Sequence, residues 1–230
     1  QTARKMPTDA IKKVAAYGAD GQPLSFLHPW QDDFIQWALQ TMTVIPVTAR
    51  GIESFKRVQL PFQHGAVCLH GATILTPEGD IDAAWHTQMQ TLLTPYQTRL
   101  ATLLEQLLQN GHELKLSLRG WLEQVGSLSV YLVIKTKTSR HEDLEQLWQH
   151  SANTLDLHGF YRHQNGNNLA LIPSGVNKRV AVVELLRRHQ AQFGRVPVLG
   201  MGDSVSDLGF MRLCDFAAFP PRSQIGQHIP

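Results

Sequence analysis

Two aspartates four residues apart, Asp203 and Asp207, stand in the glycine-containing stretch 200–207, directly after the apolar run 196–199. A short apolar run of this kind is typical of a buried strand. Carboxylates introduced by glycines at the carboxyl end of a strand can bind a hard divalent cation such as Mg²⁺. A second interpretation is a strand-to-helix turn in which Asp203 or Ser204 caps the next helix. These residue types alone favour neither interpretation.

Two further side chains suited to phosphate binding stand at the ends of other predicted elements. Thr48 follows the apolar run 43–47, which predicts a strand, and Lys178 lies in the first turn of a helix predicted from 176 to about 192. Loops at the carboxyl ends of parallel strands gather at one edge of a sheet, so these residues can meet there. A hydroxyl with backbone amides, a cation and a metal-binding acid are the groups that hold a phosphoryl group.

Each of these residues also has a structural interpretation. Thr48 can cap the next helix, Lys178 can be a solvated surface lysine, and Asp207 can be an ordinary first-turn acid. Lys178 stands at the helix end where the dipole disfavours a cation, which favours an anionic partner nearby. The order Thr, Lys, Gly-Asp-x-x-x-Asp is less expected by chance than any part of it, so we favour the phosphoryl site.

The elements that must position these residues alternate between strands and helices near both ends of the chain. After a hairpin at 14–27 and a helix from about residue 29, the expected elements are strand 43–47, helix 52–58, strand 66–69, helix 176–192, strand 196–199, helix 208–213 and strand 216–219. This alternation predicts an α/β fold with a parallel sheet.

The middle of the chain has a different pattern. A hairpin at 72–80 and a long helix at 84–109, kinked at Pro95, are followed by strands at 114–118, 127–136, 155–161 and 169–172 and a helix at 141–150. About a hundred residues are enough for an α+β domain. We therefore expect a core domain at 1–70 and 173–230, with a second domain at 71–172.

Composition excludes several classes of protein. The 230 residues carry a formal charge of +2, which is too small to indicate nucleic-acid binding, and no apolar run is long enough for a membrane span. Two cysteines indicate a reduced cytoplasmic protein rather than a disulfide scaffold, and the eleven histidines show no metal-ligand spacing. A dinucleotide site is disfavoured because Val205 replaces the third glycine of its fingerprint.

Residues 44–50, Lys178 and the stretch Gly-Asp-Ser-x-Ser-Asp-Leu-x-Phe-Met at 202–211 resemble the second, third and fourth motifs of the haloacid dehalogenase (HAD) superfamily. The wording of the last motif and the inserted middle region resemble the Cof-type and sucrose-phosphate-phosphatase-like branch. This resemblance implies a Rossmannoid core with an α+β cap, and a Mg²⁺-dependent phosphatase acting on a small phosphorylated metabolite, with a sugar phosphate as one candidate.

The resemblance also implies roles for individual residues. Thr48 and the amide of Ala49 would bind the phosphoryl group, Lys178 would balance its charge, and Asp203, with Asp207 beside it, would bind Mg²⁺. The chain has Thr48-Ala49-Arg50 where the family often has Thr-Gly-Arg, a change that keeps the amide.

A larger departure is that the family's first motif, Asp-x-Asp-x-Thr, whose two aspartates are the nucleophile and the acid/base, does not occur in the sequence. Residues 1–5 resemble the segment directly after that motif, so we expect the nucleophile of an aspartyl-phosphate mechanism to lie upstream of Gln1. The alternative is a non-catalytic HAD-like protein that binds a phosphoryl ligand.

Overall fold

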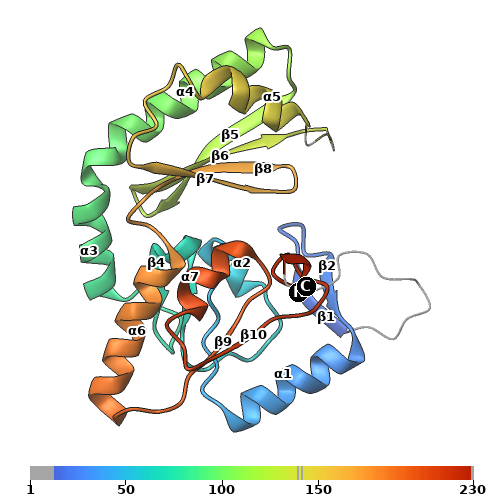
Figure 1. Cartoon of the computed structure of the whole chain (residues 1–230), viewed down its shortest axis with the longest axis vertical. Helices are drawn as coiled ribbons and strands as arrows, with labels where there is room; N and C mark the ends of the chain where they lie inside the picture. The colour runs from blue at the N-terminus through green and yellow to red at the C-terminus, as the bar shows by residue number, and fades with distance from the viewer. Residues whose placement is uncertain (1–12, 139, 141, 229–230) are drawn as a thin grey trace. The chain divides into compact units, whose positions relative to one another are not determined.

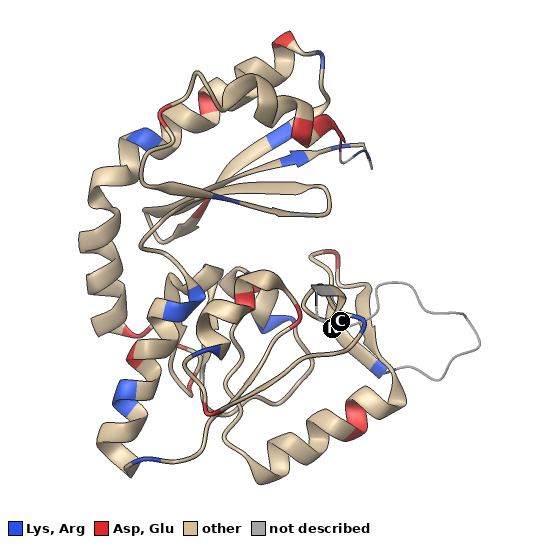
Figure 2. Cartoon of the chain, in the orientation of Figure 1, with Lys and Arg blue, Asp and Glu red and all other residues tan. Residues whose placement is uncertain are grey.

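The chain forms two compact units in the computed structural model, which describes residues 13–138, 140 and 142–228 (Figure 1). One unit comprises Gln1–His86 and Asn177–Pro230, and the other comprises Thr87–Val176. Residues 1–5, whose sequence resembles the segment after a first motif, lie outside the described residues. Lys and Arg are interspersed with Asp and Glu over both units (Figure 2). None of the described helices has the length and apolar character that a membrane crossing requires.

The first unit begins with the predicted hairpin and helix. Strands β1 (Lys13–Tyr17) and β2 (Pro23–Leu27) pair antiparallel, and helix α1 (Pro29–Thr41) follows. Gln31 in the first turn of α1 accepts a hydrogen bond from the backbone N–H of His28, which supports the start of the helix. The aromatic side chains of α1 are largely exposed: Trp37 retains 50% of its accessible surface, whereas Ala38 is buried.

The prediction of a regular strand at 43–47 is wrong. In the described part of the chain it is reduced to a single parallel bridge between Val47 and Val67. Helix α2 (Ile52–Lys56) then leads to β3 (Ala66–Cys68), which pairs antiparallel with β4 (Thr73–Leu75). A parallel ladder needs backbone partners along its length, and the short β3 supplies them over very few residues.

The C-terminal part of this unit contains helix α6 (Lys178–Phe193), followed by the parallel pair β9 (Leu199–Met201) and β10 (Phe216–Ala218), which α7 (Leu208–Met211) connects. Asn177 caps α6, because its side chain accepts the hydrogen bond from the backbone N–H of Val180. The strand also starts later than predicted, since the N–H of Val198 donates to Asp215 rather than to a neighbouring strand.

The second unit is a four-stranded antiparallel sheet in the order β5-β6-β8-β7, with helices α4 and α5 on one face (Figure 1). Leucines and isoleucines of the sheet and helices form its core. Pro95 divides the long helix as predicted. The strand predicted at 114–118 is wrong, because the backbone N–H of Leu116 donates to the carbonyl of Gly111 at the end of α4. The elements are α3 (Ala83–Leu93), α4 (Gln97–Glu113), β5 (Leu118–Val125), β6 (Leu128–Thr136), α5 (Glu142–Ser151), β7 (Phe160–Asn165) and β8 (Asn168–Pro173).

The boundaries of the units differ from the predicted second domain at 71–172. Residues 72–86 belong to the first unit, because β4 pairs with β3 and the indole N–H of Trp85 donates to the carbonyl of Gly71 at 3.0 Å. The expected hairpin at 72–80 is present as a turn at 76–80 with an antiparallel bridge between Leu75 and Ile81, and β4 also pairs with β3. The helix α3 crosses the division between the two units.

Candidate functional site

A buried ion pair joins Lys178, the first residue of α6, to Asp207, the last residue of the short 3₁₀ helix η3 (Val205–Asp207). The Lys178 Nζ lies 2.6 Å from Asp207 Oδ1, and the two side chains are 11% and 6% exposed. Removing two charges from water is costly, so such a pair persists where further hydrogen bonds satisfy its remaining atoms.

Asp207 has those further bonds. Its Oδ2 accepts hydrogen bonds from the backbone N–H groups of Asp203 and Ser204, both at 3.1 Å, and from the Ser204 hydroxyl at 3.0 Å. Burial by itself would raise the pKa of Asp207, but the charge of Lys178 and these hydrogen bonds outweigh burial and lower the pKa. The ionised carboxylate therefore holds Lys178 and the 203–204 backbone in fixed positions.

The glycines before this turn are required by close packing. A Cβ added to Gly202 would lie 2.5 Å from the Cβ of Asp207 and 2.7 Å from the sulfur of Met211. A Cβ on Gly200 would lie 2.8 Å from the Cys214 sulfur. A side chain at either position would separate β9 from the turn and from α7, so the two glycines bring Asp203 and Asp207 together.

Asp203 differs from Asp207 in that its carboxylate accepts no hydrogen bond from the described residues, and it is partly exposed. Its backbone carbonyl accepts from the N–H of Ile225 at 3.3 Å, which fixes the backbone behind the side chain. Ser204 and Asp207 form the capping arrangement of the second interpretation, and the metal site at Asp203, whose carboxylate stays open, stays a prediction.

The turn at 203–207 offers few side-chain ligands for a magnesium ion. The described residues contain no group of three or more histidine, cysteine or acidic side chains arranged for a metal. Mg²⁺ keeps several waters and is often bound by one or two carboxylates together with substrate phosphate oxygens, and the open Asp203 carboxylate fits that arrangement. Asp207 was predicted as a second ligand, but both of its oxygens are engaged, which favours an orienting role.

Thr48 occupies a tight turn after the 43–47 segment. Its N–H donates to the Val67 carbonyl at 2.8 Å, and its hydroxyl oxygen accepts from the N–H of Arg50 at 3.2 Å. Ala49, the other predicted phosphate-binding residue, therefore lies inside a turn that the Thr48 side chain closes. An oxygen that accepts one hydrogen bond still has its own proton to donate to a ligand.

Thr48 makes no direct hydrogen bond to Lys178. The backbone of residues 69–71 lies between the two residues and contacts both. The Thr48 carbonyl accepts from the N–H of His70 at 3.2 Å. The next residue, Gly71, has a φ of +107°, and a Cβ there would lie 2.3 Å from the Asn177 carbonyl oxygen and 3.1 Å from the nitrogen of Lys178. The structure thus places the four predicted side chains in one unit, and direct hydrogen bonds join Lys178, Asp207 and the Asp203 backbone.

Sequence reasoning missed Asn177 and the left-handed residues His70 and Gly71 as parts that build the site. Asn177 had a signal, because asparagine is a favoured residue directly before a helix. The left-handed His70, with a φ of 57°, had no signal, since a non-glycine residue in that conformation is uncommon.

Comparison with known proteins shows similarity at the level of fold. No family model matches the sequence, and none of the curated proteins matches it either. Among solved structures, a HAD-like hydrolase from Bacteroides thetaiotaomicron is similar with a TM-score of 0.54 and 11% identity, over 89% of this chain and 90% of that chain. A trehalose-6-phosphate phosphatase related protein is similar with a TM-score of 0.51 and 16% identity, over 84% and 75% of the two chains.

A third similar structure is an N-terminally truncated IMP-nucleotidase from Plasmodium falciparum, with a TM-score of 0.56 and 11% identity, over 85% of this chain and 62% of that chain. At these identities the similarity concerns the fold. The similarity confirms the predicted α/β class and the predicted HAD-like fold. The names of the trehalose-6-phosphate phosphatase related protein and of the IMP-nucleotidase refer to different kinds of phosphorylated compound.

Proposed function

The chain has the fold of the HAD-like hydrolases, and from this premise we propose that it is a Mg²⁺-dependent phosphoric monoester hydrolase acting on a small phosphorylated metabolite. The observation that carries the proposal is the buried Lys178–Asp207 pair, which holds the backbone of Asp203 and leaves its carboxylate open. Fixed charges and donors of this kind stabilise a transferring phosphoryl group without reorganising during the reaction.

Each residue has a separate part in the proposed reaction. The Thr48 hydroxyl and the amide of Ala49 donate hydrogen bonds to the phosphoryl oxygens, and Lys178 balances their charge. Asp203 would hold Mg²⁺, which when bound neutralises phosphoryl charge as a Lewis acid. Asp207 keeps Lys178 and the 203–204 backbone in place, which pre-organises the site.

A further part of the proposal concerns which residue acts as the nucleophile. We place it on an aspartate upstream of Gln1, because the Asp-x-Asp-x-Thr motif does not occur in residues 1–230, where the pair Asp80 and Asp82 is followed by Ala84 in place of the threonine. Its carboxylate oxygen would form a bond to phosphorus while the ester oxygen leaves as an alcohol, and water would then release inorganic phosphate and restore the aspartate. Residues 87–176 would act as the cap that selects the leaving group.

The substrate class and the cellular setting rest on separate observations. A sugar phosphate is our first candidate, supported by the wording of residues 202–211 and by similarity to a trehalose-6-phosphate phosphatase related protein. A cytoplasmic setting is supported by Cys68 and Cys214, which are both free thiols.

The proposal is tested by p-nitrophenyl phosphate hydrolysis with the full-length protein, upstream residues included, in Mg²⁺ and after EDTA treatment. Asp203→Ala should lose activity, whereas Lys56→Ala, at an exposed lysine paired with Glu53, should keep it. Full turnover by Asp203→Ala, or turnover unaffected by EDTA, contradicts the proposed role of Asp203.

A second candidate function is favoured by the same absence of the Asp-x-Asp-x-Thr motif from residues 1–230. A non-catalytic protein would bind phosphoryl ligands at Thr48, Lys178 and Asp203 without hydrolysing them. Inorganic phosphate would then raise the melting temperature according to its affinity for the folded state, with no turnover by the full-length protein. Turnover excludes this candidate.

A further inference from the structure

Three consecutive residues between β3 and β4, namely Leu69, His70 and Gly71, have positive φ angles of 52°, 57° and 107°. Among the described residues, the only other non-glycine residue with a positive φ is Lys115. A left-handed backbone brings the Cβ of an L-residue too close to the following carbonyl oxygen, so two such residues in succession are unfavourable. Unfavourable backbone conformations persist where the surrounding structure enforces them, and they cluster at functional sites.

The two non-glycine residues, Leu69 and His70, which we call the left-handed step, donate both of their backbone N–H groups to the turn at 48–50. The N–H of Leu69 donates to the Arg50 carbonyl at 2.9 Å. The N–H of His70 donates to the Thr48 carbonyl at 3.2 Å. In a regular parallel ladder, Leu69 would donate to Thr48 and would in turn accept from Arg50. The left-handed step instead pairs the carbonyls of both residues of the turn.

These two hydrogen bonds fix the direction of the amides in the turn. In a trans peptide the N–H points away from the C=O of the preceding residue, and the described residues contain no cis peptide bond. Because the Thr48 carbonyl points toward His70, the N–H of Ala49 points away from His70. The same relation holds between the Arg50 carbonyl and the N–H of Gly51. The left-handed step thus draws two carbonyls to one side of the turn and directs two N–H groups to the other, where they can attract an anion.

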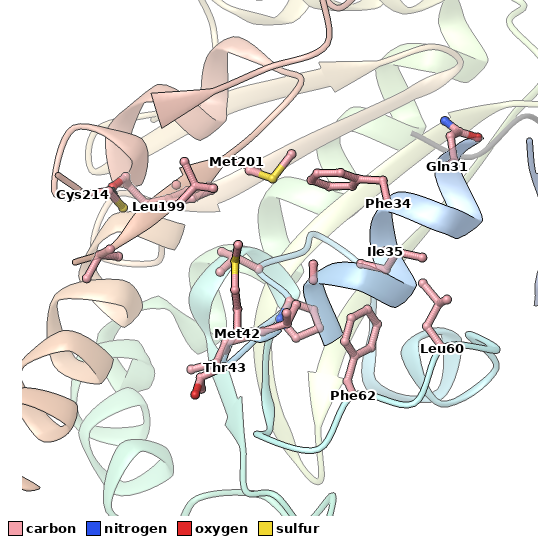
Figure 3. A pocket seen from close by; sticks show the side chains of 18 of the residues that line it. Gln31, Phe34, Ile35, Met42, Thr43, Leu60, Phe62, Leu199, Met201 and Cys214 are labelled. Carbon is pink, nitrogen blue, oxygen red and sulfur yellow. Dashed lines mark hydrogen bonds between the residues drawn. The ribbon is translucent and has the colours of Figure 1, made fainter. Parts of the chain in front are cut away.

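The segment 43–47, which leads into this turn, borders an apolar space. It lines a cavity of about 790 Å³, where Phe34 of α1 and Met201 of β9 point toward each other (Figure 3). The backbone hydrogen bonds that hold the segment and the turn come from Val67 and from the left-handed step. The position of the turn therefore depends on β3 and on the residues that follow β3.

The last residue of the tripeptide contacts the start of α6. A Cβ on Gly71 would lie 2.3 Å from the Asn177 carbonyl oxygen and 3.1 Å from the nitrogen of Lys178, so the two backbones touch. The indole N–H of Trp85 donates to the Gly71 carbonyl at 3.0 Å. All three residues of the tripeptide are buried. A buried tripeptide, held at both ends, thus joins the turn of Thr48 to the residue that carries the cation of the site.

We propose that His70 is a positioning residue of the candidate site, and that it acts through its left-handed backbone rather than through its imidazole. In this conformation it orients the Ala49 amide for an anionic phosphoryl group and sets the distance between Thr48 and Lys178. Glycine and asparagine adopt a positive φ more readily than other residues, so either can serve in its place. The inference rests on the proposed function for its ligand, whereas the orientation of the turn can be measured without one.

Three variants of the full-length protein separate backbone conformation from side-chain chemistry at position 70. His70→Gly and His70→Asn remove the imidazole and keep the left-handed conformation accessible. His70→Val also removes the imidazole, but its branched Cβ makes a positive φ strongly unfavourable. Lys115→Val is the matched control, because Lys115 has a φ of 56° at an exposed position after α4 in the second unit.

Hydrogen exchange of the Arg50 amide reports the turn in the absence of a ligand, because this N–H donates to the Thr48 hydroxyl oxygen at 3.2 Å within the turn. We expect exchange at Arg50 to accelerate by at least about tenfold in His70→Val, because the turn then opens more often. Exchange should stay within about threefold of the wild type in His70→Gly, His70→Asn and Lys115→Val.

Turnover of p-nitrophenyl phosphate reports the same geometry in the proposed reaction. Well below each melting temperature, the kcat of His70→Val should fall by at least about tenfold, because a displaced donor no longer meets the phosphoryl group. His70→Gly and His70→Asn should keep most of the activity. A residue that only stabilised the fold would lower the melting temperature and leave the kcat of the folded enzyme unchanged, as we expect for Lys115→Val.

Equal exchange at Arg50 in the wild type and the position-70 variants would overturn the proposal. Loss of turnover in His70→Gly and His70→Asn with unchanged exchange would assign the role to the imidazole and would also overturn it. If His70→Val does not fold, His70→Ala replaces it, since alanine disfavours a positive φ less strongly than valine. A wild-type protein without turnover would contradict the proposed function, whereas the exchange comparison would still decide the positioning role.

Discussion

Lys178 Nζ and Asp207 Oδ1 lie 2.6 Å apart, 29 residues apart in sequence, with both side chains almost entirely removed from water. The pair joins the start of α6 to the turn after β9. It is both a structural connection and the electrostatic centre of the candidate site, so its loss has two measurable consequences.

The first consequence concerns stability. Asp207→Ala leaves a buried lysine without its partner, and we expect the free energy of unfolding to fall by about 3–5 kcal/mol. Urea denaturation at constant m-value measures the change. The control is Glu53→Ala, whose exposed pair with Lys56 should contribute less than about 1 kcal/mol. A similar small loss for both variants would contradict the importance of the buried pair.

The second consequence concerns acid. The pKa of Asp207 in the folded protein lies below its ordinary value of 3.8, so the unfolded chain binds the proton more readily. Its contribution to stability is therefore complete above pH 3.8 and is lost as the pH falls through the lowered folded pKa. Urea midpoints measured on acidification should fall more steeply for the wild type than for Asp207→Asn. Parallel curves would show that Asp207 does not contribute.

Gly71 gives a prediction about backbone packing. Gly71→Ala places a Cβ 2.3 Å from the Asn177 carbonyl oxygen at a φ of +107°, so the alanine must displace the start of α6. Gly79→Ala is the matched control, because Gly79 has a φ of +89° with open space around it. We expect about 1 kcal/mol for Gly79→Ala and clearly more for Gly71→Ala in thermal unfolding. Equal losses would mean that the contact with Asn177 is easily relieved.

The two thiols give a prediction about reactivity. Burial raises the pKa of Cys68 to about 12, and Cys68 has no accessible surface. Because the thiolate is the reactive form, iodoacetamide at mildly alkaline pH should modify Cys214 well before Cys68 in the 230-residue chain. Peptide mapping after a time course measures both rates. Faster modification of Cys68 would indicate that β3 opens readily.

The sequence allowed the fold class, and the location of the candidate residues in one part of the molecule, to be predicted better than their local geometry. The order of Thr48, Lys178 and Asp203 along alternating elements predicted an α/β fold with these residues in one part of the molecule, and the described structure places them in one unit. The pattern did not separate the roles of the two aspartates. That difference depends on which carboxylate the turn buries, and burial is set by tertiary packing rather than by spacing.

The elements differed for local reasons. Pro95 correctly marked a break, because a proline disrupts a helix wherever it stands. The apolar run 43–47 did not become a regular strand, because strand formation depends on backbone partners that propensity does not describe. Trp37 on α1 is exposed, because helical periodicity indicates which residues share a face without indicating what covers that face.

The edge of β9 opposite β10 also affects the solubility of the 230-residue chain. Leu199 and Met201 keep 42% and 45% of their surface exposed along a strand with one partner in the described structure. An exposed apolar strand edge is a template for pairing with other chains, so this polypeptide should precipitate as its concentration rises. The solubility of the chain thus depends on the backbone groups of Leu199 and Met201.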